Sequence, residues 1–493
     1  MSKTEICPVH KKCGGCRYQG VPYEEQLKIK EKMVGKLMGK YCKIYPIAGM
    51  EDPKHYRNKV HAVFDRDRKG NIISGVYKEG THQVIPVESC MIEDVLADEI
   101  IGTIRKLAKS FKIKTYDEDT GYGLLRHILV KRAFATGQVM VVIVTASPVF
   151  PSRNNFVKAL LKEYPQITTI IHNINDKRTS MVLGEREKVI YGKGYIEDML
   201  CGKKFRISAK SFYQVNPVQT EILYKKVIDA AGFTGKEYVI DAYCGIGTIG
   251  IVASDHVDSV VGVELNRDAV RDAIGNAKAN NIKNIRFVCE DAGRFMVRLA
   301  DAARRDSSVR LPDVVLMDPP RSGSDEAFLS SLVKMSPKTV VYVSCNPVTL
   351  ERDVKWLEKK GYKAEGVWPV DMFPFTEHVE SIVLLSHKSP DSVINVKVEF
   401  GEGEGKVPLD AIAERAKKYQ PKPKITYKMI QEYVEKKYGF KVHTVYIAEV
   451  KRSLGLTMYD APNTTEELKQ PRKHPPKEKV EAIKEALKYF EVI

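Results

Sequence analysis

The feature that most constrains the fold is a regular alternation of apolar runs with helical segments between residues 206 and 388. Five runs, spaced 20 to 35 residues apart, read EYVIDAY, SVVGVEL, NIRFVCE, DVVLMDPP and TVVYVSCN. Apolar runs separated by helices are typical of strands that are buried on both faces of a parallel sheet. Two further strands, EGVWPVDMF and SIVLLSHK, close the region. The predicted fold class is therefore α/β, with helices covering both faces of the sheet.

A glycine-rich loop, DAYCGIGTIG at residues 241–250, follows the first strand directly and opens a helix. Gly245, Gly247 and Gly250 have the spacing GxGxxG, which lets the backbone turn sharply and approach a ligand at the carboxyl edge of the sheet. Glu264 ends the next strand, where a carboxylate can accept hydrogen bonds from both hydroxyls of a ribose. These features fit NAD and S-adenosylmethionine equally well.

The ends of the fourth and fifth strands indicate the chemistry. The fourth ends in DPPR, and Arg321 stands where many methyltransferases of exocyclic amines have an aromatic residue that stacks on the base. This argues against amine methylation. The fifth ends in SCNPVTLERD, which places Cys345 at the edge of the sheet where ligands bind. Asn346 and Pro347 break the strand at once, so we expect an accessible nucleophilic thiol there, not a small buried hydrophobe.

A nucleophile at this place fits methylation at C5 of uracil. That carbon is not nucleophilic enough to attack a sulfonium methyl group, but addition of a thiolate to C6 creates an enolate in which C5 is electron-rich. After the methyl transfer, a base must remove the C5 proton so that the thiolate can leave. Glu380, in MFPFTEHVES, is the candidate base. His378 is the alternative, and Glu377 is expected to be solvated.

A cysteine cluster near the N-terminus predicts a metal site. Cys7, Cys13 and Cys16 have C-x5-C-x2-C spacing, and Cys90 follows in PVESCMIED. Disulfides are not expected in a cytosolic chain, whereas four thiolates can hold structural zinc or a [4Fe–4S] cluster. A Cys-His-Cys-Cys zinc site that includes His10 is also conceivable. Taken alone, these residues leave zinc and iron–sulfur about equally supported.

Composition indicates a polyanionic partner and a cytoplasmic protein. The 493 residues are too many for one hydrophobic core, and the formal net charge of +16 favours nucleic acid. No apolar run is long enough to span a bilayer, and the N-terminus lacks the apolar core of a secretory signal. Two basic segments, HYRNKVHAV and GLLRHILVKR, predict RNA contacts by Arg57, Asn58, Arg126 and His127.

The sequence divides into five segments. Residues 1–95 hold the cysteine cluster, short strands and an amphipathic helix at residues 22–41 whose apolar stripe is Leu27, Ile29, Met33 and Leu37. Residues 96–205 are expected to form a central RNA-binding α+β region, and residues 206–388 a methyltransferase catalytic domain. Residues 389–410 are a linker, and residues 411–493 a basic helical appendage.

The appendage holds 18 Lys and Arg against 11 Asp and Glu. Two helices, ITYKMIQEYVEKKYG and TVYIAEVKRSLG, are expected to form a module like a helix-turn-helix, with KQPRKHPPKEK (residues 469–479) as an extended basic arm. Its sequence supports RNA binding and protein docking about equally.

Five motifs, in order, resemble those of the RNA 5-methyluridine (uracil-C5) methyltransferase family of the RumA/TrmA type. They are QVNP (residues 214–217), DAYCGIGTIG, DPPR, SCNPVTLERD and DMFPFTEHVES, and the resemblance covers residues 7 to about 388. It implies a class I S-adenosylmethionine-dependent methyltransferase domain, Rossmann-like, after an N-terminal iron–sulfur and RNA-binding α+β region. It further implies that Cys345 is the nucleophile and Glu380 the base. The residues that it assigns to S-adenosylmethionine are Gln214, Tyr243, Glu264 and Asp318.

The same resemblance favours a [4Fe–4S] cluster on Cys7, Cys13, Cys16 and Cys90, because the ribosomal-RNA branch of the family carries such a cluster on this cysteine pattern. Its expected role is structural or RNA-contacting. Two departures from the family are Phe375, where many relatives have His, and the expected lack of an N-terminal TRAM barrel, since only six residues precede Cys7.

The expected substrate is a uracil of 23S rRNA. The alternatives are the T-loop of tRNA, whose bacterial enzymes usually lack the cluster, and a catalytically inactive RNA-binding assembly factor. An NAD-dependent iron–sulfur oxidoreductase is disfavoured because SCNP and DPPR have no role in hydride transfer. We expect neither DNA nor a membrane as partner, and the sequence leaves the oligomeric state open.

Overall fold

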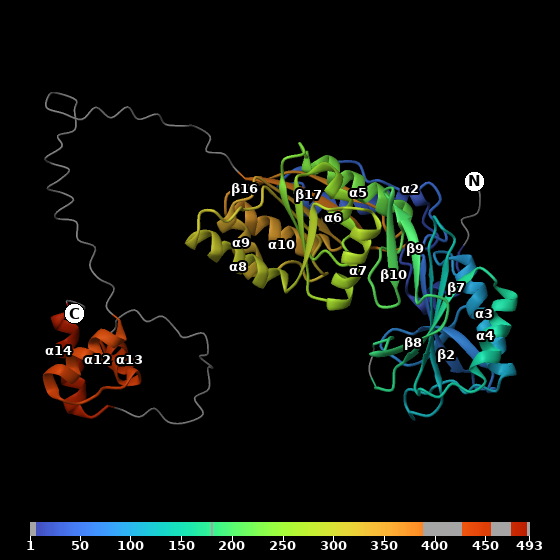
Figure 1. Cartoon of the computed structure of the whole chain (residues 1–493), viewed down its shortest axis with the longest axis horizontal. Helices are drawn as coiled ribbons and strands as arrows, with labels where there is room; N and C mark the ends of the chain where they lie inside the picture. The colour runs from blue at the N-terminus through green and yellow to red at the C-terminus, as the bar shows by residue number, and fades with distance from the viewer. Residues whose placement is uncertain (1–5, 179–180, 388–425, 455–474, 491–493) are drawn as a thin grey trace. The chain divides into compact units, whose positions relative to one another are not determined.

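The computed structural model describes residues 6–178, 181–387, 426–454 and 475–490. The chain divides into a large compact unit, residues 1–391, and a small C-terminal unit, residues 392–493. Figure 1 shows the helices and strands of both, coloured from blue to red along the chain. No helix in the described part of the chain is both long and apolar enough to cross a membrane. Every site residue predicted from the sequence belongs to the large unit.

An eight-stranded sheet contains the seven strands expected between residues 206 and 388. Its spatial order is β1 (Lys43–Ile44), β16 (Tyr362–Val370), β17 (Glu380–His387), β15 (Thr339–Ser344), β14 (Val314–Met317), β11 (Tyr238–Ala242), β12 (Ser259–Glu264) and β13 (Ile285–Cys289). All neighbouring strands are parallel except β17, which is antiparallel to β15 and β16. Strand order reverses between β11 and β14, and sheets of this type bind ligands beyond the carboxyl ends of the strands at such a point. The predicted α/β sheet is confirmed, and β1 is an additional strand from the N-terminal segment.

Helices cover both faces of this sheet because successive residues of each strand alternate between two cores. Val239 of β11 belongs to one core and Ile240 to the other. The first core includes α5 (Pro217–Ala231), α6 (Thr248–Ala253) and α7 (Arg267–Ala279). The second includes α2 (Tyr23–Met38), α8 (Ala292–Arg305), α9 (Glu326–Met335) and α10 (Pro347–Glu358).

Helix α2 buries a different face from the one that the sequence predicted. The buried residues, which repeat every four positions, are Gln26, Lys30, Val34 and Met38. Ile29, from the predicted stripe, is exposed, and the other members of that stripe are half-buried. Polar residues can occupy the buried face because the loop between β16 and β17 offers hydrogen-bond partners to Gln26 and Lys30.

A second sheet combines strands from the segments 1–95 and 96–205. Its order is β4 (Val84–Pro86), β3 (Ile72–Tyr77), β2 (Lys59–Arg66), β5 (Leu125–Arg132), β6 (Val139–Thr145), β7 (Ile167–Ile174) and β8 (Arg186–Tyr191). A hairpin joins β2 to β3, which pair antiparallel. Helices α3 (Val95–Ser110) and α4 (Arg153–Glu163) pack on one face of this sheet.

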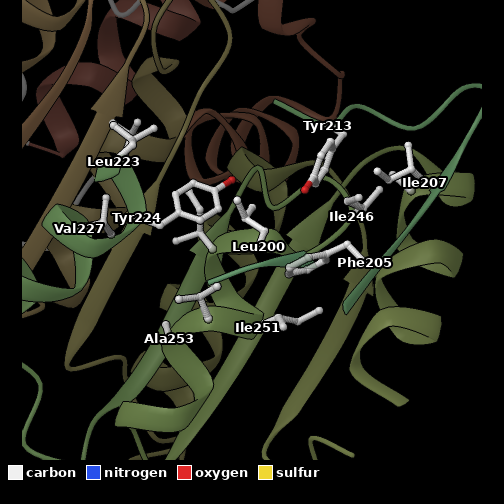
Figure 2. Packing of buried hydrophobic residues seen from close by; sticks show 14 of the residues in the cluster. Leu200, Phe205, Ile207, Tyr213, Leu223, Tyr224, Val227, Ile246, Ile251 and Ala253 are labelled. Atoms are coloured by element: carbon white, nitrogen blue, oxygen red, sulfur yellow. The ribbon is translucent and has the colours of Figure 1, made fainter. Parts of the chain in front are cut away.

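A hairpin, β9 (Tyr195–Leu200) and β10 (Lys203–Ser208), connects the two sheets through a shared core. Figure 2 shows its side chains Leu200 and Phe205 packed near Ile246 and Ile251, which belong to the glycine loop and α6. The same core reaches the second sheet through Leu129 of β5. The eight-stranded and seven-stranded sheets therefore share one hydrophobic core, which includes Ile246 of the glycine loop.

The C-terminal unit contains three described helices, α12 (Tyr427–Tyr438), α13 (Thr444–Ser453) and α14 (Lys477–Tyr489), around one apolar core. The first two correspond to the predicted pair. The third was not predicted, and the expectation of an extended arm is wrong for residues 477–479, which open α14 because Ile483 and Leu487 join the core. The rest of that arm up to residue 474, and the predicted linker at residues 389–410, lie outside the described residues.

Candidate active site

The glycine loop joins β11 to α6 at the point where the strand order reverses. Gly245 and Gly247 have φ values of 56° and 81°, in the left-handed region that favours glycine. The Gly250 N–H donates to Asp241 Oδ2 at 2.8 Å, and a Cβ at Gly250 would lie only 2.7 Å from that oxygen. The other oxygen of Asp241 is buried with no partner among the described residues. Burial raises the pKa of this carboxyl to about 7.

Glu264, at the end of β12, connects the glycine loop to the next loop. Its Oε2 accepts the Gly245 N–H at 3.0 Å, and its Oε1 accepts the Asn266 N–H at 2.7 Å. These bonds fix the carboxylate at the edge of the sheet. Each oxygen of an ionised carboxylate has a second lone pair, so Glu264 can accept further hydrogen bonds from a ligand.

Tyr243 and Gln214, the other predicted ligands of the methyl donor near this loop, come from different segments. Tyr243 follows β11; its hydroxyl lies 3.1 Å from Ser324 Oγ, and its ring packs 5.4 Å from that of Phe328. Gln214 precedes α5, and its backbone oxygen accepts Asn58 Nδ2 at 3.2 Å. Tyr243 thus lies beside the loop that follows Asp318, whereas the described hydrogen bonds do not bring Gln214 into contact with the other predicted ligands.

Cys345 follows β15 directly, and Glu380 is the first residue of the neighbouring strand β17. Strand β15 ends at Ser344, which pairs with Ser381 in the antiparallel ladder with β17. Cys345 and Glu380 are the chain neighbours of these two serines, and the charge of Glu380 raises the pKa of the Cys345 thiol. The structure therefore brings together the two residues that the sequence analysis proposed as nucleophile and base.

The turn after Cys345 is fixed by hydrogen bonds that the sequence SCNP supplies. Asn346 caps helix α10, because its Oδ1 accepts the Val348 N–H at 3.1 Å. Its Nδ2 donates to the backbone oxygen of Arg321 at 3.0 Å. Pro347 occupies the first position of the helix, where its missing N–H costs nothing. This turn leaves Cys345 partly accessible at the end of β15.

Charges around Cys345 work in opposite directions. Burial, followed by the carboxylates of Glu380 and Asp318, raises the pKa of the thiol to about 11, while Arg321 lowers it. Burial and Asp318 likewise raise the pKa of Glu380, against the effect of Arg321. Glu380 is only 4% exposed, and its Oε2 has no partner among the described residues. The site is thus a group of acidic side chains with Arg321 as a neighbouring cation.

His378, the alternative base, lies in the loop between β16 and β17. It is partly buried, and burial and then Arg321 lower its pKa. Its ring meets that of Phe373 edge to face at 6.1 Å. Glu377 is exposed, and its Oε2 lies 3.8 Å from Nε of Arg17. Arg321 thus acts on the pKa of both His378 and Cys345, which makes it a common neighbour of the alternative base and the nucleophile.

The four predicted metal ligands line one pocket of about 590 Å³, next to helix α1 (His10–Cys13). They are Cys7, Cys13, Cys16 and Cys90, all of them free thiols. Within the described ranges, no three His, Cys, Asp or Glu side chains lie close enough to hold a metal ion. His10 Nδ1 lies 2.7 Å from the backbone oxygen of Cys7. The donor set is gathered around a common space, and the metal stays a prediction.

The predicted RNA contacts are corrected in part, because β5 is a central strand of the second sheet. Arg126 is 1% exposed; it pairs with Glu118 at 2.7 Å and donates to the Asn175 oxygen at 2.7 Å. Asn58 and His127 are buried as well. A fully paired, buried guanidinium cannot contact a phosphate, so Arg126 is a structural residue. Of the four, only Arg57 is partly exposed.

Three functional candidates were missed by the sequence analysis. Asp241 is the first residue of the motif DAYCGIGTIG, and its position next to the glycines could have indicated a role in the site. Arg321 was considered only for the aromatic residue that it replaces. Lys30 was not considered, although its place one turn from Gln26 and Val34 on the buried row of α2 could have indicated a partner.

Comparison with known proteins adds independent findings. The model of the tRNA (uracil-5-)-methyltransferase family matches residues 157–388. An RNA methyltransferase of Clostridium acetobutylicum is 44% identical over 391 residues, covering 78% of this chain and 84% of that protein. One of Bacillus cereus is 40% identical over 389 residues, covering 78% and 83%. Both relatives carry names that describe them as uncharacterized RNA methyltransferases.

Among solved structures, the chain is similar to the tRNA (uracil-54, C5)-methyltransferase of Pyrococcus abyssi in complex with S-adenosyl-L-homocysteine. The two share 27% sequence identity with a TM-score of 0.62, over 75% of this chain and 85% of that one. The two chains share the fold that the motifs predict, so the class I methyltransferase architecture is confirmed.

Proposed function

The chain belongs to the RNA uracil-5-methyltransferase family and uses S-adenosylmethionine as methyl donor, and from this premise we propose that it methylates C5 of a uracil in 23S rRNA through a covalent bond between Cys345 and C6. The observation that carries the covalent route is the placement of Cys345 and Glu380 next to Ser344 and Ser381, the pair that ends the β15–β17 ladder, where the charge of Glu380 acts on the thiol. Nucleophile and base are then close enough to act on adjacent atoms of one pyrimidine ring.

The reaction has three steps at this site. The Cys345 thiolate adds to C6, and the electron pair of the C5–C6 bond moves into an enolate. C5 then bonds to the methyl carbon as the bond from that carbon to the sulfonium sulfur breaks. Finally, Glu380 takes the C5 proton, the C5–C6 double bond re-forms and the bond from C6 to Cys345 Sγ breaks. The raised pKa of Glu380 suits a group that must accept a proton and release it again.

Arg321 is proposed to favour the first step. It opposes the carboxylates that raise the pKa of Cys345, and an adjacent cation stabilises a thiolate. Neutralising Asp318 would act in the same direction, because that carboxylate raises the pKa of the thiol. Asp318 faces the methyl donor in this proposal.

The methyl donor supplies an electrophilic methyl group on a sulfonium sulfur. Glu264 suits its ribose, because both carboxylate oxygens are already fixed by backbone N–H groups and can still accept hydrogen bonds. Tyr243 and Gln214 are proposed to complete the donor site. Asp241, whose buried Oδ1 has no partner among the described residues, is a further polar group at the same strand ends.

The cysteine pocket is proposed to hold a [4Fe–4S] cluster with a structural role. Four free thiols line one space, and this number and type of ligand suits such a cluster. The chain brings them from the segment around α1 and from Cys90, so binding would tie these two segments together. Zinc is the alternative occupant, since four thiolates also satisfy its tetrahedral coordination.

The choice of 23S rRNA rests on the cysteine pattern, and the competing substrate is tRNA. The similar Pyrococcus abyssi protein acts on uracil 54 of tRNA, which keeps this alternative open. The reaction is expected in the cytoplasm.

One experiment separates the substrates. 5-Methyluridine should be mapped across 23S rRNA and tRNA from cells with and without this protein, and the purified protein should be assayed on transcripts of both. We expect one or more 23S sites to lose the modification and the matching rRNA fragment to be methylated in vitro. Loss confined to the tRNA T-loop would replace the rRNA proposal, and no loss in either RNA would favour an inactive assembly factor.

A further inference from the structure

The first five residues of the loop between β16 and β17, residues 371–379, accept hydrogen bonds from distant segments. Val370, the last residue of β16, pairs with Glu380, the first residue of β17, so this loop leads directly into the proposed base. Each of its first five backbone oxygens accepts a hydrogen bond. The donors to residues 371–375 are, in order, Gln219 Nε2, Asn216 Nδ2, Lys30 Nζ, Tyr56 Oη and the Tyr18 N–H.

Helix α2 binds this loop through an ion pair and hydrogen bonds. Lys30 Nζ lies 2.6 Å from Asp371 Oδ1, and both side chains are 0% exposed. The same ammonium donates to the backbone oxygen of Phe373 at 3.0 Å. One turn earlier on the helix, Gln26 Oε1 accepts the Phe375 N–H at 3.0 Å. A row of buried polar residues on α2 thus fixes both ends of the segment 371–375.

The strain in this segment shows that it does not adopt its shape unaided. Phe375 has a φ of 66°, a left-handed conformation that is unfavourable for a large side chain. Its N–H and oxygen are taken by Gln26 and by the Tyr18 backbone. Hydrogen bonds from α2 and the residues before it therefore hold a conformation that the loop sequence alone disfavours.

A buried ion pair is not needed merely to pack α2 against the sheet. Val34 and Met38, the next buried positions on α2, pack with apolar contacts alone. Replacing a buried pair by apolar residues is often neutral or stabilising. Tyr23 Oη also donates to Asp371, at 2.9 Å. The pair is therefore explained better by the geometry that it imposes on the loop than by packing.

We propose that Lys30 and Asp371 are positioning residues for the elimination step. They fix the start of the loop that carries His378 and ends at Glu380, and so set the distance between the base and the C5 proton. This inference rests on the proposed function, in which that proton must leave before Cys345 is released. Neither residue touches the reacting atoms. Loosening the loop should slow proton removal more than attack by Cys345 or methyl transfer.

The test compares Lys30→Met with Lys28→Met. Lys28 is on the same helix, but its side chain is 74% exposed. Each full-length variant is incubated with the RNA fragment that the mapping experiment identifies and with S-adenosylmethionine labelled in its methyl group, then run on a denaturing gel. We expect Lys30→Met to lower the turnover number by about 10–10²-fold, since small misplacements of a catalytic group have such costs. Labelled protein–RNA adduct should accumulate in this variant. Its affinity for S-adenosylmethionine should stay within about twofold of that of the unmodified protein. Lys28→Met should behave like the unmodified protein in all three measurements.

The adduct distinguishes positioning from a merely structural role. A variant that is only less stable has fewer active molecules, and each of these completes its reaction, so the adduct does not accumulate. Asp371→Asn, which keeps the size of the side chain, gives the same readout if Lys30→Met does not fold. The double variant Lys30→Met with Asp371→Asn removes both buried charges; it should recover thermal stability and still accumulate adduct, because the bond to the Phe373 oxygen is absent.

Failure of this inference and failure of the proposed function give different results. If Glu380→Gln traps the adduct while Lys30→Met and Asp371→Asn turn over normally, or lose activity without adduct, then Lys30 and Asp371 do not position the base. If neither Glu380→Gln nor His378→Ala traps any adduct, the covalent route itself is wrong, and the positioning role falls with it.

Discussion

Cys345 and Glu380 take the cross-strand positions next to the Ser344–Ser381 pair of β15 and β17. The charge of Glu380 acts on the Cys345 thiol and raises its pKa. A uracil bonded to Cys345 through C6 would therefore carry its C5, the adjacent ring atom, towards Glu380. Because β17 runs antiparallel to β15, the start of β17 lies at the same edge of the sheet as the end of β15. The nucleophile after β15 and the base at the start of β17 can therefore reach one site.

The reactivity of Cys345 towards iodoacetamide should keep rising as pH increases beyond the range of an ordinary cysteine. Burial and the charges of Glu380 and Asp318 raise the pKa of the thiol to about 11, so little thiolate exists at neutral pH. Arg321→Gln removes a cation that lowers this pKa, and alkylation at a given pH should slow. Mass spectrometry of the peptide that contains Cys345 measures the rate, and a change of one pKa unit alters the thiolate fraction about tenfold.

Glu380→Gln should change the same rate in the opposite direction. A negative neighbour disfavours the thiolate, so its removal lowers the pKa of Cys345 and speeds alkylation. Because the pKa of Glu380 is itself raised, its charge appears only as pH rises, and the gain should grow with pH. Identical profiles for the unmodified protein and both variants would show that these charges do not act on the thiol.

Replacing Cys345 with Ser should lower methyl transfer by several orders of magnitude, as loss of a covalent nucleophile does. Affinity for S-adenosylmethionine should be nearly unchanged, because the thiol bonds to the base and not to the donor. Equilibrium dialysis with labelled donor and a turnover assay measure the two properties. Cys289→Ser is the matched control, since Cys289 is exposed at the end of β13. Substantial turnover by Cys345→Ser would identify another nucleophile.

Local patterns were sufficient for the elements that position the site. Apolar runs and the glycine spacing are properties of short stretches, and the ends of parallel strands meet at one edge of a sheet. For that reason Glu264 and Cys345 could be placed at this edge from the sequence. Their chemical roles were inferred from residue type and position and from the motif resemblance, and they stay proposals.

Features that depend on pairs distant in sequence were not predictable in this way. Lys30 and Asp371 are 341 positions apart, and a lysine on an amphipathic helix normally indicates a solvated face. Arg126 likewise has the sequence character of an RNA contact, but it pairs with Glu118 and donates to the backbone oxygen of Asn175, which lies 49 positions away. In both cases the partner that makes burial of the charge possible is visible only in the folded chain.

Protein purified without oxygen should be brown and contain about four irons per chain if the cysteine pocket holds a [4Fe–4S] cluster. Cys90→Ser should lose colour and iron, because Cys90 is the ligand that joins a distant segment to the others. Cys42→Ser should keep its colour and its iron, since Cys42 packs against the core of the eight-stranded sheet. Visible absorption and metal analysis provide the measurement. Colourless protein with about one zinc per chain would assign the pocket to zinc.

Replacement of Glu380 separates the two halves of the covalent mechanism. Glu380→Gln should still permit Cys345 to attack and the methyl group to move, because neither step needs the base. Release should stall, since the C6–sulfur bond cannot break until the C5 proton leaves, and a general base commonly contributes about 10²–10⁴-fold. The variant should accumulate a protein–RNA adduct that carries labelled methyl and survives a denaturing gel. The adduct should disappear when Cys345 is also replaced by Ser. If Glu380→Gln turns over normally while His378→Ala traps the adduct, the nucleophile stands and the base is His378.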